Sequence, residues 1–341
     1  MFLLLIALLV LVVMASKPSK NILFQSYISV PQTQSLKGLF VITIFLNHFC
    51  PYIQVDSLCD QVVWKYCRFL GQSMVVPFLF YSGYGIFESA KKKGMSYISA
   101  FPKKRIFKVL IHFDLAVILF LMLDFVIEKP VTPAEFLLSL VGWESIGNSN
   151  WFIFAILCAY TIAFVGLSIF KCDLKKAFYF ILFFTLVYMV VMFQFKEIRW
   201  YDTIITFPLG CALSLYKEKF ERYICRRNIM IVLGLSVFAY IFAKFGYIPY
   251  HSVNRMIAPF VFTFILVFLS FYIHFESKIL SWFGTQVFGI YILQRLPMNL
   301  GKYLHWDELN EHFYFVFCFI VTLLLAIAFK RVTDFIDSKV L

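Results

Sequence analysis

The sequence predicts an all-α protein, a polytopic transmembrane helical bundle with about eleven spans. Of its 341 residues, 62% are hydrophobic, and the mean hydropathy is +0.83. An ordinary soluble domain is only roughly 45 to 50% apolar. Charged residues make up 15% of the chain, and they gather between apolar runs of about 17 to 22 residues, the length that crosses a bilayer core as a helix. The runs are continuous rather than alternating, which argues against a transmembrane β-barrel.

The apolar runs place spans near residues 2–15, 38–56, 69–90, 105–127, 150–170, 177–194, 203–216, 229–246, 256–275, 282–299 and 313–329. The first run could instead be a signal peptide, because it is short and no Lys or Arg precedes it. Cleavage would leave Lys17, Lys20 and Lys37 outside, against the positive-inside rule. We therefore expect a retained span and a cytoplasmic linker over residues 1–32, followed by one integral membrane domain over residues 33–341.

The formal net charge is +12, and the basic residues lie in short loops beside the spans. There they set the orientation and attract anionic lipid head groups, so we expect membrane lipids rather than nucleic acid as partners. Their alternation places the N-terminus outside and the C-terminus in the cytoplasm. The eight cysteines include no CxxC and no His-Cys pairing at zinc spacing, so no metal site is expected. Cys59 and Cys67 share one loop and could pair in an oxidising compartment.

The stretch from Leu36 to Ile53, LKGLFVITIFLNHFCPYI, holds two ionisable side chains within an apolar run. Lys37 and His48 are eleven residues apart, which on a helix separates them by about 16 Å, roughly half a bilayer core. An ionisable group at that depth is costly and indicates a functional site unless a partner explains it. An imidazole there could take a proton from a hydroxyl and return it, whereas the alternative is a histidine that only hydrogen-bonds a neighbouring helix.

Two further stretches have both a structural and a functional interpretation. In VPFLFYSGYGIFE, Ser82 can hydrogen-bond across a helix interface, and Gly83 and Gly85 allow helices to approach closely, so packing alone explains it. In KKRIFK, which follows Pro102 at the expected start of a helix, Arg105 and Lys108 are three apart and share one face. A pair of cations there suits a phosphate-rich ligand, although membrane anchoring is the simpler explanation.

The segments on the outer side add other polar candidates. Glu144 lies near the outer mouth, where it could orient an imidazole or hold a polar acceptor. Asn150 and Trp151 are consistent with a helix N-cap and an interfacial aromatic anchor. Gln294 lies near the outer end of the late span and is expected to face protein or a cavity rather than lipid.

These stretches, in this order, resemble acyltransferase family 3, the integral membrane O-acyltransferases that modify bacterial polysaccharides and other extracytoplasmic acceptors. The resemblance covers about residues 33 to 329 and is carried by LKGLFVITIFLNHF, PFLFYSGYGIF, KKRIFK, NWFIFAILCAY and LSWFGTQVFGIYILQRLPM. It implies location in the bacterial inner membrane, with acetyl-CoA as the cytoplasmic donor. The implied acceptor is a hydroxyl of a surface glycan or lipid-linked sugar.

The resemblance also implies roles for individual residues. Arg105 and Lys108 would hold the CoA phosphates, Lys37 would support the donor, and His48 would act as general base or acyl relay. Glu144 would orient His48 or the acceptor. The supporting residues would be Ser82, Asn150, Trp151, Tyr291 and Gln294.

This chain departs from the family pattern at three of these positions. The family usually has arginine where Lys37 and Lys108 stand, and lysine lacks the bidentate fork that suits phosphate. The family commonly has histidine where Gln294 stands, and an amide cannot exchange a proton near neutral pH.

Two other classes of protein remain compatible with the sequence. A transporter or flippase of lipid-linked sugars would also place polar groups at mid-membrane, although the sequence has no clear internal repeat of the kind that such folds usually show. A membrane scaffold would explain the packing motifs but not His48 or the pair formed by Arg105 and Lys108. The acyl group, acetyl or a larger one such as succinyl, is not specified by the sequence.

Overall fold

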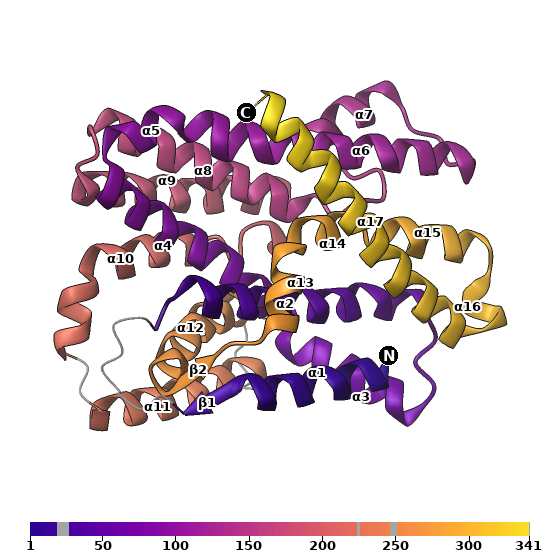
Figure 1. Cartoon of the computed structure of the whole chain (residues 1–341), viewed down its shortest axis with the longest axis horizontal. Coiled ribbons are helices and arrows are strands. Elements are labelled where there is room, and N and C mark those ends of the chain that lie inside the picture. Colours follow the sequence, from indigo (N-terminus) through magenta and orange to yellow (C-terminus); the bar gives the residue numbers. More distant parts are fainter. Residues whose placement is uncertain (19–26, 224–225, 246–250, 341) are drawn as a thin grey trace.

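The computed structural model describes residues 1–18, 27–223, 226–245 and 251–340, and helices dominate these ranges (Figure 1). Most of the long helices run roughly along the longest axis of the molecule, and α4 and α17 cross it obliquely. The one sheet in the described ranges pairs β1 (Ser16–Pro18) with β2 (Ile273–Phe275) in antiparallel fashion. The predicted fold class, an all-α polytopic bundle, is confirmed.

Each predicted span coincides with a helix or with consecutive helices in the described residues. These are α1 (Phe2–Ala15), α2 (Val30–Phe49), α4 (Val76–Lys93), α6 (Lys108–Val126), α8 (Trp151–Ile169), α9 (Leu174–Phe195), α10 (Thr206–Tyr223), α11 (Arg226–Phe245), α12 (His251–Tyr272), α13 (Lys278–Thr285) with α14 (Val287–Leu293), and α17 (Glu311–Val340). Shorter helices that lie largely outside the predicted spans are α3 (Leu58–Leu70), α5 (Met95–Phe101), α7 (Pro133–Leu140) and α16 (Trp306–Leu309), and α15 (Arg295–Tyr303) begins within the span predicted near 282–299. Single turns η1 (Cys50–Tyr52), η2 (Gly71–Val75) and η4 (Ile198–Trp200) are 3₁₀-helical.

Several of these helices are suited to lipid by length and composition alone. They are Met95–Val126, Trp151–Ile169, Leu174–Phe195, Asn254–Tyr272 and Glu311–Val340. On α9, the exposed fractions of Phe183, Val190 and Phe193 are 59%, 64% and 62%. Large apolar side chains exposed along a whole helix face indicate contact with membrane rather than water. The chain is therefore a multi-pass membrane protein.

The N-terminal helix is joined to the rest of the bundle at both its side and its end. Leu5 and Leu8 of α1 are buried in the main core, and α1 contacts α3. Directly after it, β1 pairs with β2 so that Ser16 lies opposite Phe275. This pairing holds the end of α1 against the end of α12. Lys20, in the predicted linker, lies outside the described residues.

Two helix boundaries differ from the sequence predictions. Pro102 does not open a helix, because α5, the π-helical turn η3 (Pro102–Phe107) and α6 follow one another without a break. Proline has no N–H for the carbonyl four residues before it, and a wider π turn accommodates that missing bond. The span predicted near 282–299 is broken into α13, α14 and α15, with Gln286 and Gln294 at the junctions.

Glycines bring two pairs of helices into backbone contact. A Cβ at Gly38 of α2 would overlap the carbonyl oxygen of Leu280 on α13, and one at Gly83 of α4 would overlap that of Phe207 on α10. The prediction of close approach is confirmed for Gly83. It is wrong for Gly85, where a Cβ would meet no described atom within 4 Å. Helices α2 and α4 are therefore fixed tightly against α13 and α10.

The cysteines predicted to pair do not do so. Cys59 is exposed, Cys67 is buried, and both are free thiols. They lie on one helix, α3, at a separation of about 12 Å along its axis, which exceeds the Cα separation that a disulfide tolerates. Cys67 instead lies within hydrogen-bond reach of Cys50.

Candidate functional site

A cavity of about 700 Å³ lies where α2 ends, and we call it the His48 cavity. Its walls come from η2, the loop before α8, the turn after η4, the starts of α12 and α15 and the end of α11. Of the residues predicted from sequence, His48, Asn150, Trp151 and Tyr291 line it. Segments almost 250 residues apart in sequence therefore converge on one site.

The imidazole of His48 is held by Gln294, which is fully buried between α14 and α15. Gln294 Nε2 is 2.9 Å from His48 Nδ1 and donates to the backbone oxygen of Tyr291, also at 2.9 Å. A carbonyl oxygen only accepts, so the amide nitrogen must face Tyr291, and the same nitrogen must then donate to His48 Nδ1. The neutral imidazole accordingly carries its proton on Nε2, and this edge remains available to the cavity.

Cationic side chains surround this histidine. Arg199 and Arg295 lie close enough to His48 to act on it electrostatically. The cations that line the cavity are Arg68, Arg199, Lys244, Arg255 and Arg295. Apart from Arg295, which lies next to Gln294, the sequence offered no signal for this cluster. Its members stand on five separate segments and meet only in the folded chain.

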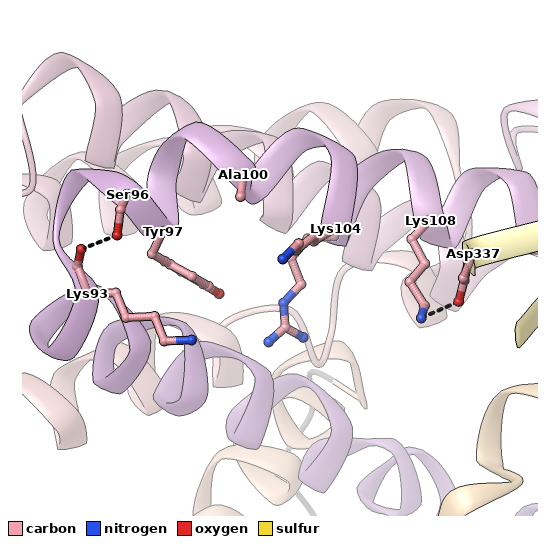
Figure 2. Close-up of a pocket in the computed structure, with 8 residues that line it drawn as sticks. Lys93, Ser96, Tyr97, Ala100, Lys104, Lys108 and Asp337 are labelled. Carbon is pink, nitrogen blue, oxygen red and sulfur yellow. Dashed lines mark hydrogen bonds and ion pairs between the residues drawn. The ribbon is translucent and has the colours of Figure 1, made fainter. Parts of the chain in front are cut away.

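A second cavity, of about 470 Å³, lies where α5 and α6 meet, and we call it the Arg105 cavity. It is lined by Lys93, Ser96, Tyr97, Ala100, Lys104, Arg105, Lys108 and Asp337. Figure 2 shows side chains of the helix reaching toward a common opening, with Lys108 paired to Asp337 of α17. The prediction that Arg105 and Lys108 share one face is confirmed.

Contacts fix the cations of this cavity unequally. Asp337 pairs with Lys108, and its Oδ1 also lies 2.9 Å from His112 Nε2. Arg105 instead lies within reach of the hydroxyls of Tyr97 and Tyr160. Neither Tyr160 nor Asp337 was singled out from the sequence, because each comes from a helix distant in the chain.

Helix α2 runs from the neighbourhood of Arg105 to the His48 cavity. Lys37, near its start, lies close enough to Arg105 for the two cations to repel each other, and His48, eleven residues later, lines the other cavity. On the Arg105 side, the Tyr160 hydroxyl also donates to Ser82 Oγ of α4 at 3.3 Å. The structure therefore brings Lys37, Ser82 and Arg105 into one neighbourhood.

Residues 34–331 match the family model of acyltransferase family 3, which is described as an acyltransferase domain. The chain belongs to this family. No curated protein and no solved structure gives a significant match. Family membership over most of the chain, together with the apolar helices, makes it a membrane acyltransferase.

Asn150 and Trp151, two of the remaining predicted residues, lie where the loop before α8 meets that helix. Asn150 stands at the N-cap of α8 but makes no side-chain cap bond within the described residues, and its Nδ2 instead donates to the Gly142 carbonyl at 2.9 Å. Trp151 lines the His48 cavity. Asn150 therefore fixes the loop that forms one wall of the cavity.

Glu144 lies apart from the described residues that line the His48 cavity. Its Oε1 is 3.2 Å from Lys196 Nζ. Lys196 in turn lies over the rings of Trp143 and Trp200, at 4.1 and 4.7 Å from the ring centroids. In this structure the partner that orients His48 is Gln294 rather than Glu144.

Proposed function

We propose that this membrane acyltransferase is an O-acyltransferase that moves an acetyl group from cytoplasmic acetyl-CoA to a hydroxyl of an extracytoplasmic polysaccharide or glycolipid. The donor would bind in the Arg105 cavity and the acceptor in the His48 cavity. The observation that carries the proposal is the course of α2, which has Lys37 near Arg105, a lining residue of one cavity, and His48 in the wall of the other. A protein that handled only one substrate on one side would not need both.

At the donor end, CoA offers a diphosphate and a 3′-phosphate, and the Arg105 cavity presents four cations: Lys93, Lys104, Arg105 and Lys108. Arg105 supplies the planar fork that suits phosphate, and lysines act as point charges. Lys37 lies near Arg105 without lining this cavity, and it would hold the donor end nearest the acyl group. No metal is required for this mode of binding.

The chemistry exchanges one acyl bond for another. The bond from the acyl carbon to the CoA sulfur breaks, the bond to the acceptor oxygen forms, and the hydroxyl proton ends on the CoA thiolate. In its resting tautomer, His48 Nε2–H would donate to the acyl carbonyl oxygen and stabilise the charge that develops there. Because the Gln294 amide also donates to the Tyr291 carbonyl, it keeps this orientation, so stabilisation of the acyl oxygen is the role of His48 that the geometry favours over general base or acyl relay.

The distribution of Lys and Arg supports the proposed orientation of the protein in the membrane. Seven cations lie between Lys91 and Lys108, around the Arg105 cavity, and the positive-inside rule places such a cluster in the cytoplasm. We therefore place the protein in the bacterial inner membrane, with its N-terminus outside and its C-terminus in the cytoplasm. Membrane lipids would cover the exposed apolar faces.

The test compares surface glycans from cells that lack the native protein and carry wild type, His48→Ala or His305→Ala. His305 is a matched control, because its imidazole is 72% exposed and pairs with Glu308 at the surface. We expect mass spectrometry to show acylated glycan with wild type and His305→Ala, and loss of the acyl group with His48→Ala at equal protein levels. Unchanged acylation with His48→Ala would overturn the role of His48. The mass added would identify the acyl group as acetyl or succinyl.

The second candidate, a transporter or flippase of lipid-linked sugars, is favoured only by the position of polar groups within the membrane. CoA distinguishes the two. The purified acyltransferase should bind acetyl-CoA saturably and release free CoA when glycan is supplied. A transporter should do neither.

A further inference from the structure

The His48 cavity carries a large excess of positive charge. Its cations are Arg68, Arg199, Lys244, Arg255 and Arg295, and among the described residues that line it Asp202 is the one carboxylate. Collecting like charges in a partly buried cavity is costly unless something neutralises them. Acyl transfer to a neutral hydroxyl does not require a cluster of cations, so the positive charges of this cavity need another explanation.

The pairs that these cations form within the protein are weak. The only carboxylate within reach of Arg255 in the described chain is Asp202, at 3.7 Å from Nη2 to Oδ2. Arg199 pairs through Nε with Glu197, whose side chain is 71% exposed. Burial raises the pKa of Asp202 to about 7 despite the opposing charge of Arg255, so near neutral pH this carboxylate compensates only part of the excess.

Two buried donors in the same cavity also lack an acceptor. Neither Arg295 Nε nor Asn148 Nδ2 has a hydrogen-bond partner in the described part of the chain. Asn148 is 2% exposed, and its Oδ1 accepts from the Ile146 amide at 3.2 Å and from Ser145 Oγ at 3.3 Å. These bonds fix the amide, so its nitrogen cannot turn to find a partner. Buried donors normally find acceptors, so these two are available to an acceptor group of a ligand in the cavity.

We infer that the acceptor bound in the His48 cavity carries an anionic oxygen group, a phosphate or a carboxylate, beside the hydroxyl that is acylated. Arg255 and Arg295 are the residues that bind this group, and Asn148 donates a further hydrogen bond. Guanidinium groups match carboxylate and phosphate oxygens in a bidentate geometry, and the ligand would satisfy the free donors and the excess charge together. A neutral glycan would leave both uncompensated. The assignment of this anion to the acyl acceptor rests on the proposed function.

Binding of simple sugars tests this inference without requiring catalysis. The purified full-length protein in detergent is titrated with glucose, glucose 1-phosphate and glucuronate, and the three dissociation constants are compared. We expect at least one charged sugar to bind ten or more times as tightly as glucose, and raised NaCl to weaken that binding. Preference for glucose 1-phosphate identifies a phosphate site, preference for glucuronate a carboxylate site, and preference for both a general oxyanion site.

The variants assign the effect to the cavity. Arg295→Gln should reduce the affinity for the preferred charged sugar at least tenfold, toward that for glucose. Arg331→Gln, which removes an exposed cation of α17, should not. Binding of CoA by Arg295→Gln serves as the measure of correct folding, and Arg255→Gln provides a second variant if that one fails to fold.

Equal affinity for all three sugars, or a preference that survives both arginine substitutions, would overturn the inference. Failure of the proposed function is a separate outcome. It would appear as the absence of CoA release with any glycan, while the charged-sugar preference and its loss in Arg295→Gln would remain.

Discussion

The replacement Gly38→Ala should displace the helix that carries both Lys37 and His48. A Cβ at Gly38 would overlap the Leu280 carbonyl oxygen and lie 2.7 Å from the Leu280 carbonyl carbon. These are backbone atoms, which cannot rotate away as a side-chain end could. Because the carbonyl oxygen lies closer still, contact at about 3.5 Å requires α2 and α13 to separate by more than about 1 Å.

Gly38→Ala should lower both the stability of the protein and the rate of acyl transfer. Overpacking of this kind costs about 1 to 3 kcal/mol, offset by about 1 kcal/mol because alanine favours helix over glycine. Gln294 follows α13 on the same late segment, so separation of α2 also stretches the 2.9 Å bond from Gln294 to His48. A shift of about 1 Å at a catalytic group can lower the rate about 100-fold.

The matched control is Gly85→Ala, where the added methyl group meets no described atom within 4 Å. We expect Gly38→Ala to lower the midpoint of thermal unfolding in detergent and the rate of acyl transfer, and Gly85→Ala to leave both near wild type or raise the midpoint slightly. Equal behaviour of the two variants in both assays would refute the argument that backbone contact at Gly38 positions His48.

Three further outcomes are expected. Arg105→Ala should weaken CoA binding at least tenfold by isothermal titration, because a hydrogen bond to a charged group contributes about 1.5 to 3 kcal/mol; wild-type affinity would contradict this. Gln294→Leu removes the donor to His48 Nδ1, so the transfer rate at saturating CoA should fall about tenfold while CoA affinity stays constant; an effect on affinity alone would exclude a positioning role. Burial raises the pKa of Asp202 to about 7, so this side chain is neutral below that pH and anionic above it. Between about pH 6 and pH 8, glucuronate affinity should therefore fall at least about fivefold, since Asp202 lies beside the anion-binding Arg255 and a like charge within about 15 Å costs about 1 kcal/mol or more at an effective dielectric constant of about 20. The pH dependence should disappear in Asp202→Asn, and its persistence there would assign it to another group.

Local patterns in the sequence were sufficient to predict the class of fold and the distance along the helix between Lys37 and His48. Both depend on helices that satisfy their own backbone hydrogen bonds in lipid, so apolar length and residue spacing decide them. The breaks near Gln286 and Gln294 escaped prediction, because the run that contains them is apolar enough to suggest one span. The π turn at Pro102 escaped for a similar reason, since proline is equally common at a helix start.

The sequence by itself determined that this chain is a membrane-embedded helical bundle and that polar residues such as His48 and Gln294 enter its interior. Only the tertiary structure decided which of them meet. The repulsion between Lys37 and Arg105, the bond from Gln294 to His48 and the arginines around the His48 cavity all join residues from different helices. Such contacts depend on how helices cross, and here backbone approach at Gly38 and Gly83 sets the crossing. Hydropathy and spacing carry no information on that geometry, because it is fixed by the shapes of two surfaces distant in the chain.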